Sequence, residues 1–376
     1  MTALVRSAMP TALAALLLVT GCTTKGAGST GGAIAVTVTD TTCAVARTTS
    51  GPGTVEFAVT NKGATTTEFY VYAAGGRMVG EAENIGPGLS RSLHVELTEP
   101  GTYETACKPD SASAGIRAPF TVTGTGARPT AVDPLLTSAA TQYQGYVATE
   151  ADLLLARTTQ LVALVKAGRI SQAKALYPQA RAPWERIEPV AESFGDLDPK
   201  VDGREDVIED GMPFTGFHRL EKDLWVTGPQ PDTNAVADQL LTDVTTLVTR
   251  AKAVRLTALQ MANGAKALLD EIATGKVTGE EERYSHTDLW DVEANLAGSR
   301  AALTALEPFL TARDPALVRE LAGRGAALET LLQTHRKGAG FVSYTSLTPT
   351  QVKALTQALD AFAAPVSQVA GLVAKG

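Results

Sequence analysis

A histidine and a glutamate three residues apart have the clearest potential for chemistry in this chain. His218 and Glu221 stand in the stretch GFHRLE, residues 216–221. On a helix this spacing places both side chains on one face, about one turn apart. An imidazole nitrogen and a carboxylate held there can bind a metal ion. A plain hydrogen bond at a helix–helix contact is the commoner reason for such a pair when it is taken alone.

A second pair with the same spacing lies upstream and favours a metal site over a plain hydrogen bond. Glu185 and Glu188 stand beside the large apolar residues Trp184 and Ile187. Crowded carboxylates repel one another unless a cation is present. A solvated acidic loop explains residues 196–210 equally well, but it explains Glu185 and Glu188 less well. The further acidic residues between the two pairs are Glu192, Asp196, Asp198, Asp202, Glu205, Asp206, Glu209 and Asp210.

The ligand types indicate a hard or borderline metal. Carboxylates with one histidine, and no thiolate in this half of the chain, suit iron or manganese, with zinc or calcium as further options. The Glu-x-x-His motif of di-iron bundles is not present, because here the order is reversed and occurs once. The His-Glu-x-x-His helix of zinc peptidases and a glycine-rich phosphate loop are both absent. No Ser-His-Asp or Cys-His set can be argued, so we expect a protein that is not an enzyme.

Two kinds of element must position these residues. Residues 33–123 alternate apolar and polar side chains with period two, which predicts a small antiparallel β-sandwich. Residues 124–134 contain Gly, Pro and Thr and are expected to be a linker. Residues 135–376 have helical periodicity and predict an all-α bundle. Within it, Asp314-Pro315 and Thr348-Pro349 are helix starts, whereas Pro189 and Asn263-Gly264 are expected to end, bend or interrupt helices.

The first residues are expected to be a targeting segment. Residues 1–21 combine Arg6 with a short apolar run, which is typical of a signal peptide. Residues 19–22, VTGC, resemble a bacterial lipobox, in which the thiol of Cys22 takes the lipid; ordinary cleavage that leaves a free Cys22 is the alternative. Residues 22–32 would be a flexible tether. This predicts an exported protein, lipid-anchored to the outer face of the cytoplasmic membrane in the periplasmic space.

The net charge argues against one class of partner. The 376 residues carry a formal charge of −7, and removing residues 1–21, whose only charged side chain is Arg6, makes it −8. A mild negative surplus disfavours nucleic acid as a partner.

Three stretches resemble a known family. Residues 184–200 (WERIEPVAESFGDLDPK), 216–225 (GFHRLEKDLW) and 284–295 (YSHTDLWDVEAN) are similar to the imelysin-like domain of EfeO-type iron-uptake proteins. These proteins also carry an N-terminal cupredoxin-like domain. The resemblance implies iron binding, as Fe²⁺ or Fe³⁺, in the service of a membrane iron permease, with a haem-peroxidase-like partner protein. The implied metal ligands are His218 and Glu221, with Glu185, Glu188 and Asp202 as a second cluster.

The third stretch holds further candidates for the site. His286 and Glu293 are seven residues apart, on one face if the helix covers both, and Asp288 lies between them. Either His286 or Glu293 would complete the site. Alternatively, the stretch is only the start of a helix, with Asp288 favouring the helix dipole.

The cysteines of the predicted sandwich leave two alternatives open. In an oxidising envelope Cys43 and Cys107 form a disulfide. The resemblance implies instead a copper or iron site with both cysteines, Glu68 and, as a further candidate, Met78. A blue-copper centre is not expected, because His94 is the only histidine of this half and such centres need two.

Rival functions remain for the helical half. One is an imelysin-type metallopeptidase that uses His218 and Glu221. Another is an envelope module that binds calcium-bridged polyuronates through its acidic face. A third is a structural bundle that binds nothing.

Overall fold

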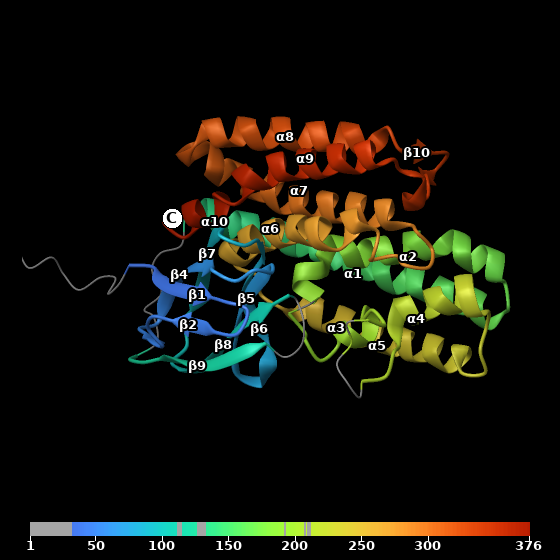
Figure 1. Ribbon diagram of the computed structural model, residues 1–376, viewed down its shortest axis with the longest axis horizontal. Coiled ribbons are helices and arrows are strands. Elements are labelled where there is room, and N and C mark those ends of the chain that lie inside the picture. Colours follow the sequence, from blue (N-terminus) through green and yellow to red (C-terminus); the bar gives the residue numbers. More distant parts are fainter. Residues whose placement is uncertain (1–31, 111–114, 126–132, 192, 207, 209–211) are drawn as a thin grey trace, which may run out of the picture. The chain divides into compact units, whose positions relative to one another are not determined.

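The computed structural model describes residues 32–110, 115–125, 133–191, 193–206, 208 and 212–376. The predicted signal peptide, the lipidation site Cys22, most of the linker and the acidic residues Glu192, Glu209 and Asp210 lie outside these ranges. Residues 32–376 form one compact unit in which strands come first and helices follow (Figure 1). Among the described residues, none of the helices combines the length and the apolar character needed to cross a membrane.

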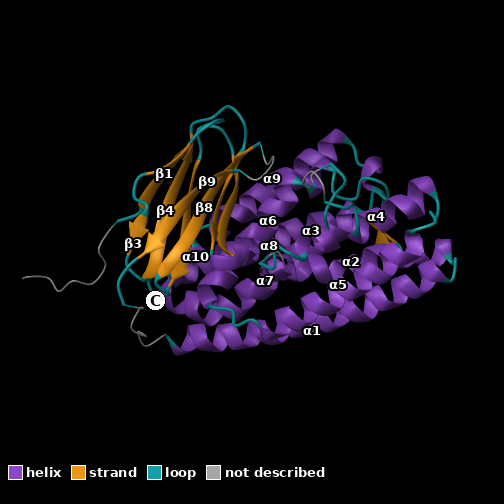
Figure 2. Cartoon of the chain, turned by 90° about the horizontal axis from the view of Figure 1, so that it is seen from below, coloured by secondary structure: helices purple, strands orange, loops and turns teal. Residues whose placement is uncertain are grey.

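The strands of residues 34–122 form two sheets (Figure 2). One has the order β2-β1-β4-β7 and the other the order β3-β9-β8-β5-β6. The bounds are β1 Ile34–Val38, β2 Cys43–Val45, β3 Thr49–Ser50, β4 Gly53–Asn61, β5 Thr67–Tyr72, β6 Met78–Ile85, β7 Ser90–Leu97, β8 Gly101–Pro109 and β9 Ile116–Val122.

The sequence predicts an antiparallel sandwich, but the observed sheets contain both parallel and antiparallel strand pairs. Strand β1 pairs with β4 in parallel, and β3 pairs with β9 in parallel. Period-two alternation identifies a half-buried strand but carries no information on its pairing partner, so this difference was not accessible from the pattern. The alternation itself is confirmed: the apolar residues of β1 and β4 point inward, and Phe57 packs against Phe69 and Phe120 with ring centroids 5.2 and 5.4 Å apart.

The helices form a second hydrophobic core of their own. Helix α1 is the longest, and α8 and α9 lie side by side (Figures 1 and 2). The bounds are α1 Pro134–Lys166, α2 Ile170–Ala191, α3 Asp198–Val201, α4 Gly216–Lys222, a π-helical turn Asp223–Thr227, α5 Thr233–Ala253, α6 Ala258–Thr274, a 3-10 turn Lys276–Thr278, α7 Asp288–Arg313, α8 Pro315–Gln333, a hairpin of β10 Arg336–Lys337 and β11 Gly340–Phe341, α9 Pro349–Val366 and α10 Val369–Val373.

Helix starts were predicted better than helix interruptions. The side chains of Asp314 and Thr348 cap α8 and α9, each followed by proline at the first helical position, as expected. However, α6 runs through Asn263-Gly264 without a break. Gly264 instead permits a close approach, because a Cβ there would lie 3.1 Å from the Cβ of Pro189 on α2. Helix α2 likewise continues past Pro189 to Ala191.

Candidate metal centre

Helices α2 and α4, the C-terminal cap of α3 and the turn before α7 bring a group of acidic residues around His218. Helix α2 supplies Glu185 and Glu188, and α4 supplies His218 and Glu221. Asp202 is the C-terminal cap of α3. Glu281 and Glu282 come from the turn that precedes α7. All of these residues are buried except Asp202, which is partly buried; Asp202 and Glu281 retain the largest exposed side-chain fractions, 9% and 8%.

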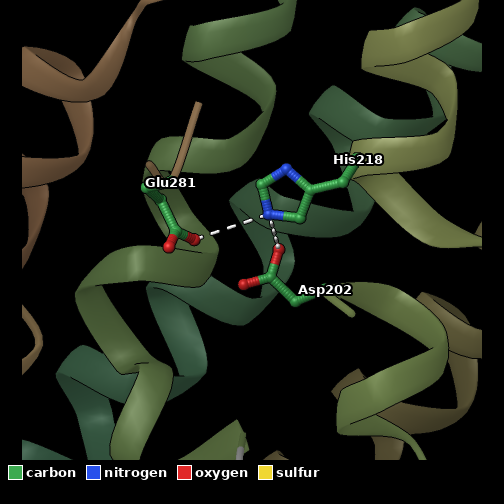
Figure 3. Close-up of side chains that lie close together, drawn as sticks. All are labelled: Asp202, His218 and Glu281. Atoms are coloured by element: carbon green, nitrogen blue, oxygen red, sulfur yellow. Dashed lines mark ion pairs between the residues drawn. The ribbon is translucent and has the colours of Figure 1, made fainter. Parts of the chain in front are cut away.

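One side of the imidazole faces two carboxylates from separate segments (Figure 3). His218 Nε2 lies 3.5 Å from Asp202 Oδ1 and 3.4 Å from Glu281 Oε1. The other Asp202 oxygen accepts a hydrogen bond from Trp184 Nε1 at 2.8 Å. Asp202, His218 and Glu281 each offer one donor atom, and these three atoms lie within 4.8 Å of one another. A single ion can bridge such a spacing.

The other side of the imidazole is oriented by Glu221. His218 Nδ1 lies 3.1 Å from Glu221 Oε2. The second Glu221 oxygen accepts hydrogen bonds from the backbone N–H groups of Tyr284 and Ser285, at 2.9 and 2.6 Å. Glu282 joins His218 and Glu221 in a second group of donors within 4.8 Å, and Glu185, Glu188 and Asp202 form a third.

The glycine of the GFHRLE stretch has a structural role in this geometry. Gly216 begins α4 with φ of 80°, in the left-handed region that favours glycine. A Cβ at this position would lie 2.3 Å from the carbonyl oxygen of Val201 and 2.7 Å from that of Lys200. Gly216 therefore lets α4 begin directly against the end of α3, which brings His218 next to Asp202.

Pro189 also contributes to the site. A proline cannot donate to the carbonyl four residues back, here that of Glu185. That carbonyl accepts instead from Asn295 Nδ2 of α7, at 2.8 Å. The same amide donates to Glu185 Oε2 at 3.1 Å and to Glu188 Oε2 at 2.9 Å. The proline thus leaves an acceptor through which α7 is held against the two glutamates of α2.

Two fully buried cations stand among the carboxylates. Arg181, one turn before Glu185 on α2, forms ion pairs with Glu185, Asp202, Glu281 and Glu282. Lys276 Nζ lies 3.1 Å from Glu185 Oε2 and 3.2 Å from Glu188 Oε2. Arg181 and Lys276 are outnumbered by the buried acidic groups around them, so ionising all of these groups would leave a surplus of negative charge.

The proton affinities of the site reflect this surplus. Burial raises the pKa of Glu188, Glu282 and Asp291 well above the usual carboxyl range, and neighbouring carboxylates add to the effect. Burial and the charge of Arg181 lower the pKa of His218, but the hydrogen bonds to Glu221 and Glu281 outweigh them and raise it to about 10. A di- or trivalent cation would replace these protons.

The five helical-half ligands named from the sequence therefore come together: His218, Glu221, Glu185, Glu188 and Asp202. The sequence analysis missed Glu281, Glu282, Arg181, Lys276 and Asp291. Arg181 could have been noticed from its helical spacing to Glu185. Glu281 and Glu282 lie in a turn without periodicity, so no sequence pattern predicted that they belong to the centre.

Of the three candidate side chains named in the third stretch, Asp288 contacts the centre, whereas His286 and Glu293 are in none of its donor groups among the described residues. Asp288 Oδ1 accepts a hydrogen bond from the Glu282 N–H at 3.1 Å. His286 precedes α7 with φ of 57°, so it is not on a helical face with Glu293. Glu293 pairs with Arg336. The reading of this stretch as a helix start is the one that matches the structure.

Several acidic residues of 196–210 have ordinary surface partners. Asp196 pairs with Arg250, Glu205 with Lys222, and Asp206 with Arg283. For these residues, the interpretation as a solvated acidic face is the one that the structure matches.

In the sandwich, the two cysteines form a disulfide, which is one of the two alternatives that the sequence left open. Cys43 of β2 and Cys107 of β8 are bonded, which joins the two sheets. Glu68 pairs with Lys108 in the ladder, one residue away from the Phe69–Cys107 pair, so it lies on the opposite face from Cys107. Its carboxylate accepts from Tyr70 at 2.9 Å. Met78 begins β6 opposite Tyr72. The implied set of Cys43, Cys107, Glu68 and Met78 is therefore not assembled.

The fold joins a cupredoxin-like sandwich to a helical domain that holds a His/carboxylate centre, and known protein families match each of these two parts. The family model for imelysin matches residues 139–369, and the model for the cupredoxin-like domain matches residues 11–117. The chain is 36% identical over 346 residues to the iron uptake system component EfeO of Escherichia coli strain K12, of Escherichia coli O157:H7 and of Shigella flexneri. Each match covers 90% of this chain and 91% of the relative.

The chain therefore belongs to the imelysin family and to the EfeO family within it, which confirms the resemblance seen in the three stretches. The relatives are named as a component of an uptake system, and that role is not enzymatic.

Proposed function

We propose that this protein is the cell-envelope iron-binding component of an iron uptake system. It captures iron at the centre around His218 and delivers it to a membrane permease, in cooperation with a haem-peroxidase-like partner. The proposed chain has a signal peptide (1–21), a lipidated Cys22 with a tether (22–32), a cupredoxin-like domain (33–123), a linker (124–134) and an imelysin-like domain (135–376). The names of its relatives support the iron uptake role.

The observation that carries the proposal is the convergence of three donor atoms on one point. Asp202, His218 and Glu281 come from three separate segments, and each offers one donor atom within 4.8 Å of the other two; His218 Nε2 lies 3.5 Å from Asp202 Oδ1 and 3.4 Å from Glu281 Oε1. Residues three or four positions apart on one helix meet by spacing alone, whereas donors from three segments meet only because the fold brings them together. Hard oxygens with one imidazole suit iron.

The proposal predicts that one histidine is needed for iron binding and another is not. We expect His218→Ala to weaken the binding of Fe²⁺, measured by anaerobic calorimetric titration, by at least about 100-fold, which is typical of the loss of a metal ligand or its orienting partner. His94→Ala, in β7 of the sandwich, is the matched control and should bind as the wild type does. Equal affinity of wild type and His218→Ala would contradict the proposal.

The same samples distinguish the metallopeptidase alternative. The carboxylates at the centre already pair with Arg181 and Lys276. We expect the iron- or zinc-loaded protein to leave denatured protein substrates intact. Cleavage that is lost in Glu221→Ala would instead favour a peptidase.

A further inference from the structure

The guanidinium of Arg181 contacts the same atoms that would bind an ion. Its NH1 group contacts Asp202 Oδ1 and lies 3.2 Å from His218 Nε2, and its NH2 group lies 3.0 Å from Glu281 Oε1. These are the three atoms of the first donor group. The Arg181 side chain is completely buried, so solvent does not weaken these contacts.

A metal ion and this arrangement of Arg181 exclude one another. An ion bonded to the three donor atoms would lie about 2.0–2.2 Å from each of them. The guanidinium nitrogens are within hydrogen-bond distance of the same three atoms, so the two positive charges would stand in contact without water between them. Once the His218 ring has lost its proton, the lone pair of Nε2 can serve only one of them, either an Arg181 N–H or the metal.

The structure offers Arg181 another carboxylate on its opposite side. Arg181 Nε lies 2.7 Å from Glu282 Oε1 and 3.6 Å from Asp291 Oδ1 of α7. Asp291 is 1% exposed, and within the described residues neither of its carboxylate oxygens has a hydrogen-bond donor. A buried carboxyl group without a hydrogen-bond donor is costly to ionise, and a guanidinium that moved toward it would stabilise its ionised form.

We propose that Arg181 is a displaceable counter-ion, which yields the three donor atoms to the incoming ion and moves toward Asp291. This inference rests on the proposed function. It assigns to Arg181 the role of a competitor that lowers the affinity of the centre, and to Asp291 the role of a positioning residue that makes release of the ligands easier. A carrier that must hand over its ion benefits from such a competitor, because the guanidinium replaces the departing charge.

A double-mutant cycle with Zn²⁺ as the probe tests the inference on the full mature chain. Arg181→Met removes the competitor, and we expect Zn²⁺ to bind about tenfold more tightly, a typical coupling between linked sites. Asp291→Asn removes the alternative partner while keeping the shape, and we expect binding to weaken by about tenfold. In the Arg181→Met background, Asp291→Asn should have almost no effect on Zn²⁺ affinity, because no guanidinium is left that could move toward residue 291. Arg186→Met, on the same helix but paired with Glu150 at the surface, is the control.

Two results would overturn the inference. One is an Arg181→Met protein that binds Zn²⁺ no better than the wild type, and the other is an Asp291→Asn effect of equal size in both backgrounds. If Arg181→Met does not fold, the wild type carries the test: the side-chain Nε–Hε NMR signal of Arg181 should shift on addition of Zn²⁺, and the shift should differ in Asp291→Asn. An unchanged signal at saturation would overturn it. The iron titration of the wild type tests the proposed function separately, because the order of the variants with Zn²⁺ does not depend on a preference for iron.

Discussion

At the scale of the residue, the side chain of His218 defines what the centre can do. The spacing of His218 and Glu221 was sufficient to predict that they share a face, and the structure shows their hydrogen bond at 3.1 Å. The sequence could not show what stands on the far side of the ring. Asp202 and Glu281 are respectively 16 residues before and 63 residues after His218 in the chain, and no periodicity relates residues in caps and turns to a helix. Arg181 was missed because a lone arginine in a helix is usually a surface residue.

The raised proton affinity of His218 predicts a pH dependence of iron binding. Its pKa of about 10 means that the ring is protonated at neutral pH, and it must lose a proton to ligate a metal. Glu282, whose pKa is also raised, releases a further proton. Binding should therefore strengthen as pH rises and weaken as pH falls, by about one factor of ten in affinity per pH unit for each proton released.

Calorimetric titration of Fe²⁺ between pH 5.5 and 7.5 measures this slope, and repeating it in buffers of different ionisation enthalpy counts the protons. An affinity that stays constant across the range would contradict the assignment of His218 and Glu282 to the site.

At the scale of the element, the start of α4 and the end of α3 set the geometry of the centre. The helix of GFHRLE was predicted from its pattern, but the contact of Gly216 with the carbonyl oxygens of Val201 and Lys200 was not. Similarly, Pro189 was expected to end or bend α2, which ends shortly after it at Ala191, but its release of the Glu185 carbonyl for Asn295 was not predicted. Local propensity shows that a glycine or proline changes the backbone conformation, and only the residues packed against it show its structural role.

Gly216→Ala should damage both stability and iron binding. An alanine at φ of 80° is strained, and its Cβ would collide with backbone that cannot move away easily. We expect a loss of about 2–4 kcal/mol in the free energy of unfolding, measured by urea denaturation, and weaker iron binding. Gly168→Ala, with φ of 65° but open space around it, should cost only about 1 kcal/mol and leave iron binding intact. Equal losses in the two variants would show that the contact of α4 with α3 is unimportant.

The disulfide of the sandwich should act on stability alone. Cys43 and Cys107 are 64 residues apart in the sequence, and closing a loop of this length stabilises a fold by about 4 kcal/mol in the chain-entropy account. The double variant Cys43→Ala/Cys107→Ala should lower the free energy of unfolding by about 2–5 kcal/mol. It should leave the stoichiometry of iron and copper binding unchanged. A bound ion lost with the cysteines would return the sandwich to the role of a metal site.

At the scale of the whole molecule, the fold class was accessible from the sequence and the connections within it were not. Period-two alternation and helical periodicity separated a sandwich from a bundle, because strands such as β1 and β4 bury alternate residues and helices such as α5 bury one stripe. Parallel pairing of β1 with β4, and the passage of α6 through Asn263-Gly264, depend on contacts between distant segments. The same distinction holds for the centre, whose ligands within one helix were predicted together, whereas those contributed by turns were found only in the folded chain.

The central claim is that iron binds where Asp202, His218 and Glu281 converge. Anomalous diffraction at the iron absorption edge, from crystals of the full mature chain loaded with iron, tests it most directly. The account predicts a peak about 2.0–2.3 Å from His218 Nε2 and bonded to at least one of the two carboxylates. A peak only on the acidic surface of residues 196–206, or beside Cys43 and Cys107, with none at His218 in saturating iron, would contradict it.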